Sequence, residues 1–245
     1  MVEKKTTTKK ASRAGARPGP KTAGKRPYQR RTRKEPKPVI MKEERKKNIP
    51  PLKLFGRWDS NVTLTEPGLK RYINLEPRFL PRSAGIHRST FHKSRMHITE
   101  RLALHILVPG HQGKRHRLTS GRATGKFDNA LQIVEDALAE IEKKEKKNPI
   151  EVLVKAIENS ALREEIISYQ LGSIMAREGV ITAPQRRVDK TLRSMAQGAY
   201  RAAFNKRIKM GQALAKEIIA ASNSSNDSNA MREKERVERE AASAR

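Results

Sequence analysis

The 245-residue sequence contains no cysteine, which excludes disulfide bridges and thiolate metal sites and is consistent with a reducing compartment. Aromatic residues are scarce, with one Trp, four Tyr and five Phe, and only 36% of the residues are apolar. Both values are low for a globular protein of this length. We therefore expect one core of modest size, with long segments that another molecule keeps ordered.

Long hydrophobic runs are also missing. None approaches the roughly 18 residues that a membrane span needs, and the richest, Leu102 to Val108, is interrupted by His105. The charged N-terminus is not followed by the hydrophobic stretch of a secretory signal. No basic amphipathic helix carries Trp or Phe on its apolar face, which disfavours a membrane surface as partner.

Positive charge is what the sequence has in excess: 54 Lys and Arg against 26 Asp and Glu, a net charge of +28. Such a surplus implies a polyanionic partner, usually nucleic acid. Residues 1–50 alone hold 18 Lys and Arg, 4 Asp and Glu, and six prolines. We interpret them as a basic N-terminal extension, disordered when free, that folds on phosphates; a solubilising or targeting tail is the alternative.

Residues 51–245 are predicted to form one mainly helical domain. Residues 52–86 mix short apolar pieces with Gly and Pro, and Trp58 is interpreted as a packing anchor rather than a base-stacking platform. Apolar residues then recur at spacings of three and four, which indicates helices. These stretches run over 98–107, 131–141, 150–157, 188–203 and 208–218, and a charged helix is expected over about 230–242.

Residues 164–182 have a different period. Apolar residues alternate from Ile167 to Leu171, Gly172-Ser173 offers a two-residue turn, and Ile174 to Ile181 run back. This pattern predicts a β-hairpin inserted between helices.

Catalytic and metal-binding patterns are weak. The six histidines between 87 and 116 lie five to eight residues apart, whereas a helix places ligands on one face at gaps of three or four. The paired carboxylates Glu43-Glu44 and Glu164-Glu165 lack an apolar pocket. The glycine loops that end in Lys114 and Lys126 lack the full spacing of nucleotide sites. We expect no enzyme activity, no metal and no cofactor.

The remaining signal is basic charge, which we assign to RNA phosphates. The candidate rRNA contacts are Arg82, Arg88, Lys93, Arg95, Lys114, Arg115, Arg117, Lys126, Arg186, Arg187, Lys190, Arg193, Arg201, Lys206, Arg207 and Lys209. Several patches, an arm and a hairpin suit RNA, whose partners contact phosphates and splayed bases over a wide area. Composition alone leaves a histone-like DNA protein open. If about ten phosphates were neutralised, log affinity would fall with log salt at a slope of roughly −7 to −9.

Six stretches resemble one family, the universal small-subunit ribosomal protein seven in its archaeal–eukaryotic form. They are KLFGRW (53–58), LPRSAG (80–85), ITERLALHIL (98–107), NPIEVLVKAIENSALREE (148–165), APQRRV (183–188) and SNAMREKERVEREAASAR (228–245). They occur in family order over about four-fifths of the chain.

The resemblance implies a bundle of about six helices with a two-stranded arm between the third and fourth. Family members bind the 3′ major domain of small-subunit (16S) rRNA and organise head assembly, beside other head proteins of the cytoplasmic ribosome. Their hairpin reaches toward the exit-site tRNA and the mRNA exit path. By position, Arg163, Arg177, Arg186 and Arg187 resemble RNA contacts near the hairpin base. Leu171, Gly172, Ser173, Ile174 and Met175 resemble the tip that faces the tRNA.

Some positions depart from the family pattern. Leu162 stands where proline is common, Phe127 replaces the third residue of the Gly125-Lys126 loop, and residues 109–124 resemble a lineage insertion. Ile166, Ile167 and Tyr169 make the hairpin more apolar than expected, which leaves a protein partner open there. The rival functions are a free, sequence-neutral nucleic-acid compactor and an RNA-processing enzyme that uses His92 or His97.

Overall fold

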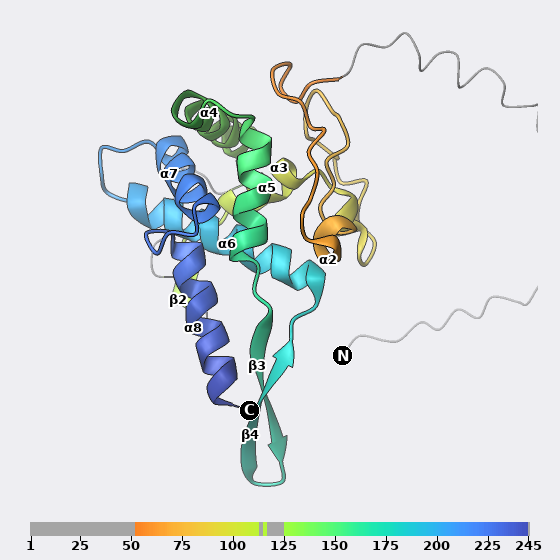
Figure 1. Ribbon diagram of the computed structural model, residues 1–245, viewed down its shortest axis with the longest axis vertical. Coiled ribbons are helices and arrows are strands. Elements are labelled where there is room, and N and C mark those ends of the chain that lie inside the picture. Colours follow the sequence, from red (N-terminus) through yellow and green to blue (C-terminus); the bar gives the residue numbers. More distant parts are fainter. Residues whose placement is uncertain (1–51, 113–114, 117–124, 245) are drawn as a thin grey trace, which may run out of the picture. The chain divides into compact units, whose positions relative to one another are not determined.

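The computed structural model describes residues 52–112, 115–116 and 125–244, which belong to one compact unit (Figure 1). Its helices are α2 (Pro67–Lys70), the 3-10 helix η1 (His92–Arg95), α3 (Ile98–Ile106), α4 (Phe127–Glu145), α5 (Pro149–Ser160), α6 (Pro184–Ala203), α7 (Met210–Ser222) and α8 (Asn229–Ser243). Its strands are β1 (His111–Gln112), β2 (Arg115–His116), β3 (Glu164–Leu171) and β4 (Ile174–Ile181).

The hydrophobic core lies where the helices meet. Helix α7 packs against α4, α5 and α6, and α3 packs against α4 and α6. Leu102, Val134, Leu153, Leu192 and Leu214 bring one side chain each from these five helices, and all five are fully buried. Burying each such side chain contributes roughly 1.5–3 kcal/mol, which explains why helices with few apolar residues still associate.

Side-chain caps fix where several helices begin. The Asn148 side chain accepts a hydrogen bond from the Ile150 amide, and Pro149 occupies the first turn of α5. The Ser228 hydroxyl accepts bonds from the amides of Ala230 and Met231 at the start of α8. These groups satisfy amides that would otherwise lack partners at the helix ends.

The hairpin is antiparallel, and its register pairs Glu164 with Ile181 and Leu171 with Ile174. Gly172 adopts a positive φ of +60°, which suits the two-residue turn. Helix α8 packs on both strands at the base of the hairpin (Figure 1). A Cβ on Gly179 would lie 2.8 Å from the Ala241 carbonyl oxygen, so this close contact requires glycine. The C-terminal helix therefore fixes the direction of the hairpin.

The predicted architecture is confirmed. Within the described ranges, six α-helices of nine or more residues surround the core, and the hairpin joins α5 to α6. Trp58 is the expected packing anchor: it is 4% exposed, and its Nε1 donates to Glu142 at 3.0 Å. The N-terminal extension (1–50) and most of the 109–124 insertion lie outside the described residues.

Two apolar positions inside the predicted helical stretches 98–107 and 208–218 do not pack in the core. Ile208 precedes α7, which begins at Met210, and it is 48% exposed. Leu104 lies on the outer side of α3 and is 38% exposed. Leu104 lies two residues from each of the buried Leu102 and Ile106, so it points away from their face of the helix. None of the described helices has the length and apolar character to cross a membrane.

Candidate nucleic-acid interface

The main basic surface runs along α6. Arg186, Lys190, Arg193 and Arg201 follow one another at gaps of four, three and eight residues, so they line one side of the helix. Arg186, Arg193 and Arg201 are exposed, and Lys190 is half-buried. The Arg201 guanidinium also donates to the Asn229 side chain of α8 at 3.2 Å. We call this row the α6 basic face.

Glu165 of β3 ties the start of this face to the hairpin. Its carboxylate accepts two hydrogen bonds from Arg186, at 2.5 and 3.0 Å, and one from Lys190 at 2.5 Å. Burial raises the pKa of Glu165, but the bonds from Arg186 and Lys190 outweigh burial and hold that pKa below its ordinary value. Two cations share one carboxylate, so the junction is rigid and still carries a positive surplus.

Arg187 has a different environment from its neighbour Arg186. Its Nε donates to the Leu162 carbonyl at 2.5 Å, and its guanidinium pairs with Glu66 at 2.7 Å. The side chain is 12% exposed, against 58% for Arg186. Arg187 therefore holds the segment before α2 against the end of α5. The sequence placed both arginines in the RNA contact set, but the structure turns Arg187 inward.

Asp189 lies beside the α6 basic face, four residues before Arg193, and it binds cations from other helices. It accepts from Lys93 of η1 and from the buried Arg101 of α3, both at 2.9 Å, and the His105 Nε2 lies 3.8 Å away. Burial raises the pKa of Asp189, but the neighbouring His105, Arg101 and Lys93 outweigh burial and hold that pKa well below its usual range. Lys93, 48% exposed, is thereby anchored to α6.

Most of the remaining predicted contacts are exposed. Arg82 pairs with Asp128 at 3.1 Å and lies over the Phe127 ring, with 5.7 Å from its guanidinium carbon to the ring centroid. Among the residues that the structure describes, several exposed cations have no carboxylate within ion-pair distance. They are Arg88, Arg95, Lys126, Arg163, Arg177, Arg193, Lys206, Arg207 and Lys209. These cations are available to phosphates.

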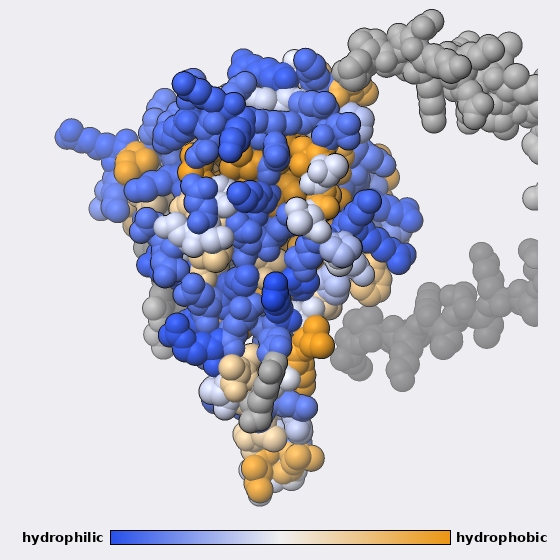
Figure 2. All heavy atoms as spheres, in the orientation of Figure 1, coloured by the Kyte–Doolittle hydropathy of each residue, from blue (hydrophilic) through white to orange (hydrophobic). Residues whose placement is uncertain are grey.

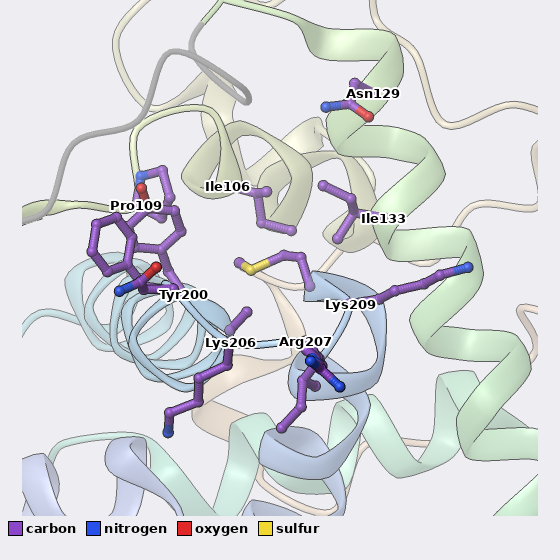
Figure 3. Close-up of a pocket in the computed structure, with 13 residues that line it drawn as sticks. Ile106, Pro109, Asn129, Ile133, Tyr200, Lys206, Arg207 and Lys209 are labelled. Atoms are coloured by element: carbon purple, nitrogen blue, oxygen red, sulfur yellow. The ribbon is translucent and has the colours of Figure 1, made fainter.

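Lys206, Arg207 and Lys209 lie in the loop from α6 to α7, at the edge of an open hollow of about 730 Å³ (Figure 3). Ile106 and Ile133 line it from α3 and α4. Tyr200 and Phe204 also line it, and their ring centroids lie 5.7 Å apart. Aromatic rings beside a row of cations form the kind of surface on which unpaired bases stack.

The hairpin tip is apolar rather than basic, and Figure 2 shows the hydrophobic side chains that gather there. Leu171, Ile174 and Met175 are 61%, 71% and 63% exposed. Alternation puts Ile167, Tyr169 and Leu171 on one face of β3, opposite the face that carries Ile166, whose cross-strand partner Gly179 contacts α8.

A second hollow, of about 840 Å³, contains basic residues that sequence reasoning missed. Lys70, Arg71 and Arg78 line it together with His87 and Arg95. These residues come from the segment between Trp58 and α3, where no regular spacing marks a common face. Only the folded chain brings them together. Of the predicted contacts, Lys114 and Arg117 lie outside the described residues, as does the side chain of Arg115.

A helical bundle with a projecting hairpin, a basic helix face and hollows edged by cations defines a structural nucleic-acid-binding protein. The comparisons with known proteins are more specific. The family model described as ribosomal protein S7p/S5e matches residues 69–245. The chain belongs to this family.

Curated archaeal relatives support the same assignment. The small ribosomal subunit protein uS7 of Nanoarchaeum equitans is 45% identical over 196 residues, which cover 79% of this chain and 99% of that protein. The uS7 protein of Archaeoglobus fulgidus is 44% identical over 196 residues, covering 79% and 95%. That of Methanococcoides burtonii is 39% identical over 195 residues, covering 79% and 99%.

Proposed function

We propose that this protein, a structural and non-enzymatic constituent of the small ribosomal subunit, binds the 3′ major domain of the small-subunit rRNA and organises assembly of the subunit head. The observation that carries the proposal is the α6 basic face, which continues into the exposed cations of the loop between α6 and α7. Glu165 neutralises only one of the two charges that it binds. The face therefore keeps its attraction for phosphate while its geometry stays fixed.

The mechanism is electrostatic and geometric. Cations on α6, on the loop after it and near η1 displace counterions from separate RNA strands. Because these elements share one core, the strands that they bind are held in one relative arrangement. The hollow beside Tyr200 and Phe204 offers a place for a splayed base.

The hairpin has a separate role in the proposal. We assign its tip, residues 171–175, to the neighbourhood of the exit-site tRNA and the mRNA exit path, and its basic base, with Arg163 and Arg177, to rRNA. The tip projects beyond the end of α8 (Figure 1), which supports a reach toward molecules outside the rRNA-binding surface. Its apolar side chains also suit a neighbouring protein of the subunit head.

The experiment is a salt titration of affinity for a 3′ major domain RNA fragment. The double variant Lys206→Ala, Arg207→Ala should make the log–log slope shallower by about 1.5, since each lost phosphate contact removes about 0.7–0.9. The matched control is Lys143→Ala, Lys147→Ala, which removes two exposed cations at the end of α4. If both double variants give the wild-type slope, the loop after α6 does not contact RNA.

A further inference from the structure

One groove has a different character from the basic surfaces. It lies between α5, the segment 62–67 and the base of the hairpin, and its volume is about 900 Å³. Four carboxylates line it, together with three cations: Glu66, Glu151, Glu158 and Glu164, and Lys155, Arg163 and Arg187. Its lining thus carries one net negative charge, in a chain whose net charge is +28. We call it the α5–hairpin groove.

Part of this charge has a structural role. Glu158 accepts hydrogen bonds from the backbone amides of Thr65 and Glu66, at 2.7 and 2.9 Å. Glu66 pairs with Arg187 at 2.7 Å. These contacts hold the wall formed by residues 62–67 against α5. Glu151, in the first turn of α5, is exposed, and its carboxylate has no hydrogen bond or ion pair within the described part of the chain. Its carboxylate is available to a ligand.

The groove also has apolar surface. Val154 of α5 is 2% exposed and contributes to the floor, and Val62 and Pro67 line the same space. Ile181, at the end of β4, is 87% exposed, the highest value among the large hydrophobic side chains left at the described surface. Burial of a side chain of this size contributes roughly 1.5–3 kcal/mol, so a partner that covers Ile181 would gain affinity from it.

We propose that the α5–hairpin groove receives a lysine- or arginine-rich segment of a neighbouring protein in the small subunit. A cation of that segment lies beside Glu151, and an apolar side chain covers Ile181. The proposal rests on the chain's place in the small subunit. RNA phosphates fit poorly beside Glu151, because the carboxylates there would repel them, whereas Arg163, at the hairpin end of the groove, keeps its assignment to rRNA. At physiological salt, charges beyond about 8 Å are largely screened, so the local carboxylates outweigh the distant cations of the chain.

The test is photo-cross-linking in purified small subunits. A benzophenone amino acid replaces Ile181 in one version of the full chain and Ile174, at the hairpin tip, in the matched control. A sucrose gradient first shows whether each chain is incorporated into small subunits. If the proposed ribosomal function were wrong, the chains would not sediment with the subunits. The probe at 181 should cross-link to a Lys- and Arg-rich segment of another subunit protein, mapped by mass spectrometry. The probe at 174 should not reach that segment.

Charge reversal supplies the second readout. Glu151→Lys should lower the yield of the 181 cross-link about threefold to tenfold, because a lysine at position 151 would repel the basic segment that Glu151 attracts. The control Glu235→Lys, on the exposed side of α8, makes the same change in net charge elsewhere and should leave the yield unchanged. A probe at the exposed Thr63, on the facing wall, replaces the 181 probe if that chain does not enter subunits.

Several results would overturn the proposal. Cross-links from 181 and 63 to rRNA alone, with no protein segment captured, would make the groove an RNA site. A protein segment without net positive charge, or no cross-link at all, would leave it without the partner proposed. Equal yields for Glu151→Lys and Glu235→Lys would remove the role of the groove's carboxylate. In each case the rRNA salt titration still decides the proposed function independently.

Discussion

The Arg187→Ala variant should unfold more easily than the wild-type protein, although it loses no direct phosphate contact. The substitution removes the hydrogen bond to the Leu162 carbonyl and the ion pair with Glu66. Hydrogen bonds made by charged groups contribute roughly 1.5–3 kcal/mol each. Glu66 is 32% exposed and is hydrated again once Arg187 is removed, so the ion pair with Glu66 contributes about 1.5 kcal/mol or less. We expect the free energy of unfolding to fall by about 2–4 kcal/mol.

Urea denaturation measures this loss. With a denaturant dependence of about 2 kcal/mol per molar, the midpoint should fall by roughly 1–2 M. Arg193→Ala is the matched control on the same helix, since Arg193 is exposed and has no carboxylate partner among the described residues. This control should leave the midpoint nearly unchanged while making the RNA salt slope shallower by about 0.7–0.9.

The opposite pattern would refute the reasoning. If Arg187→Ala kept the wild-type urea midpoint but weakened RNA binding as Arg193→Ala does, Arg187 would have to leave Glu66 and reach the RNA. A variant in which Arg186 and Arg187 are both replaced by Ala would mix the two effects, so the single variants are the informative ones.

Two further outcomes follow from buried groups. Burial lowers the pKa of His97 to about 4. Between about pH 6.5 and pH 4, His97 is therefore protonated in the unfolded chain but neutral in the native chain. The free energy of unfolding should consequently be lower at pH 5 than at pH 7 by about 2 kcal/mol. In His97→Asn, the asparagine side chain still caps α3 but does not titrate. Its urea midpoints at pH 5 and pH 7 should differ less than those of the wild-type protein. An equal difference would mean that other groups cause the pH dependence. In Gly198→Ala, the new Cβ would lie 2.7 Å from the Asn229 Cβ, so a loss of about 1–3 kcal/mol is expected in the same assay. Gly68→Ala, with no atom closer than 4.0 Å, serves as its control, and equal midpoints for the two variants would contradict the close contact.

Elements with a regular period could be predicted from the sequence. The alternation around Gly172-Ser173 gave the hairpin, and Asn148-Pro149 gave the start of α5, because both depend on neighbours in the chain. Ile208 shows the limit of this reasoning. Its spacing matched the helix that follows, but the loop before α7 leaves it beside Phe204 at the edge of a hollow.

The candidate site was less predictable, because it depends on partners distant in sequence. The sequence shows which residues are basic, but it does not show that Arg186 is exposed and Arg187 is mostly buried. That difference depends on their distant partners, Glu165 for Arg186 and Glu66 for Arg187. Glu165 was considered only as a weak candidate for acid–base chemistry, whereas it joins the hairpin to α6. The α5–hairpin groove has no local signal at all, since it forms from three separate segments.

The central claim is that positive surface charge holds several rRNA strands in one arrangement. Its most direct test is the affinity of the full chain for naked 3′ major domain RNA across a salt series, with duplex DNA measured in parallel. We predict a slope of about −7 to −9 for the RNA, a shallower slope after removal of residues 1–50, and much weaker binding to the DNA. Equal affinity for both nucleic acids, or an RNA slope that removal of residues 1–50 leaves unchanged, would contradict the account.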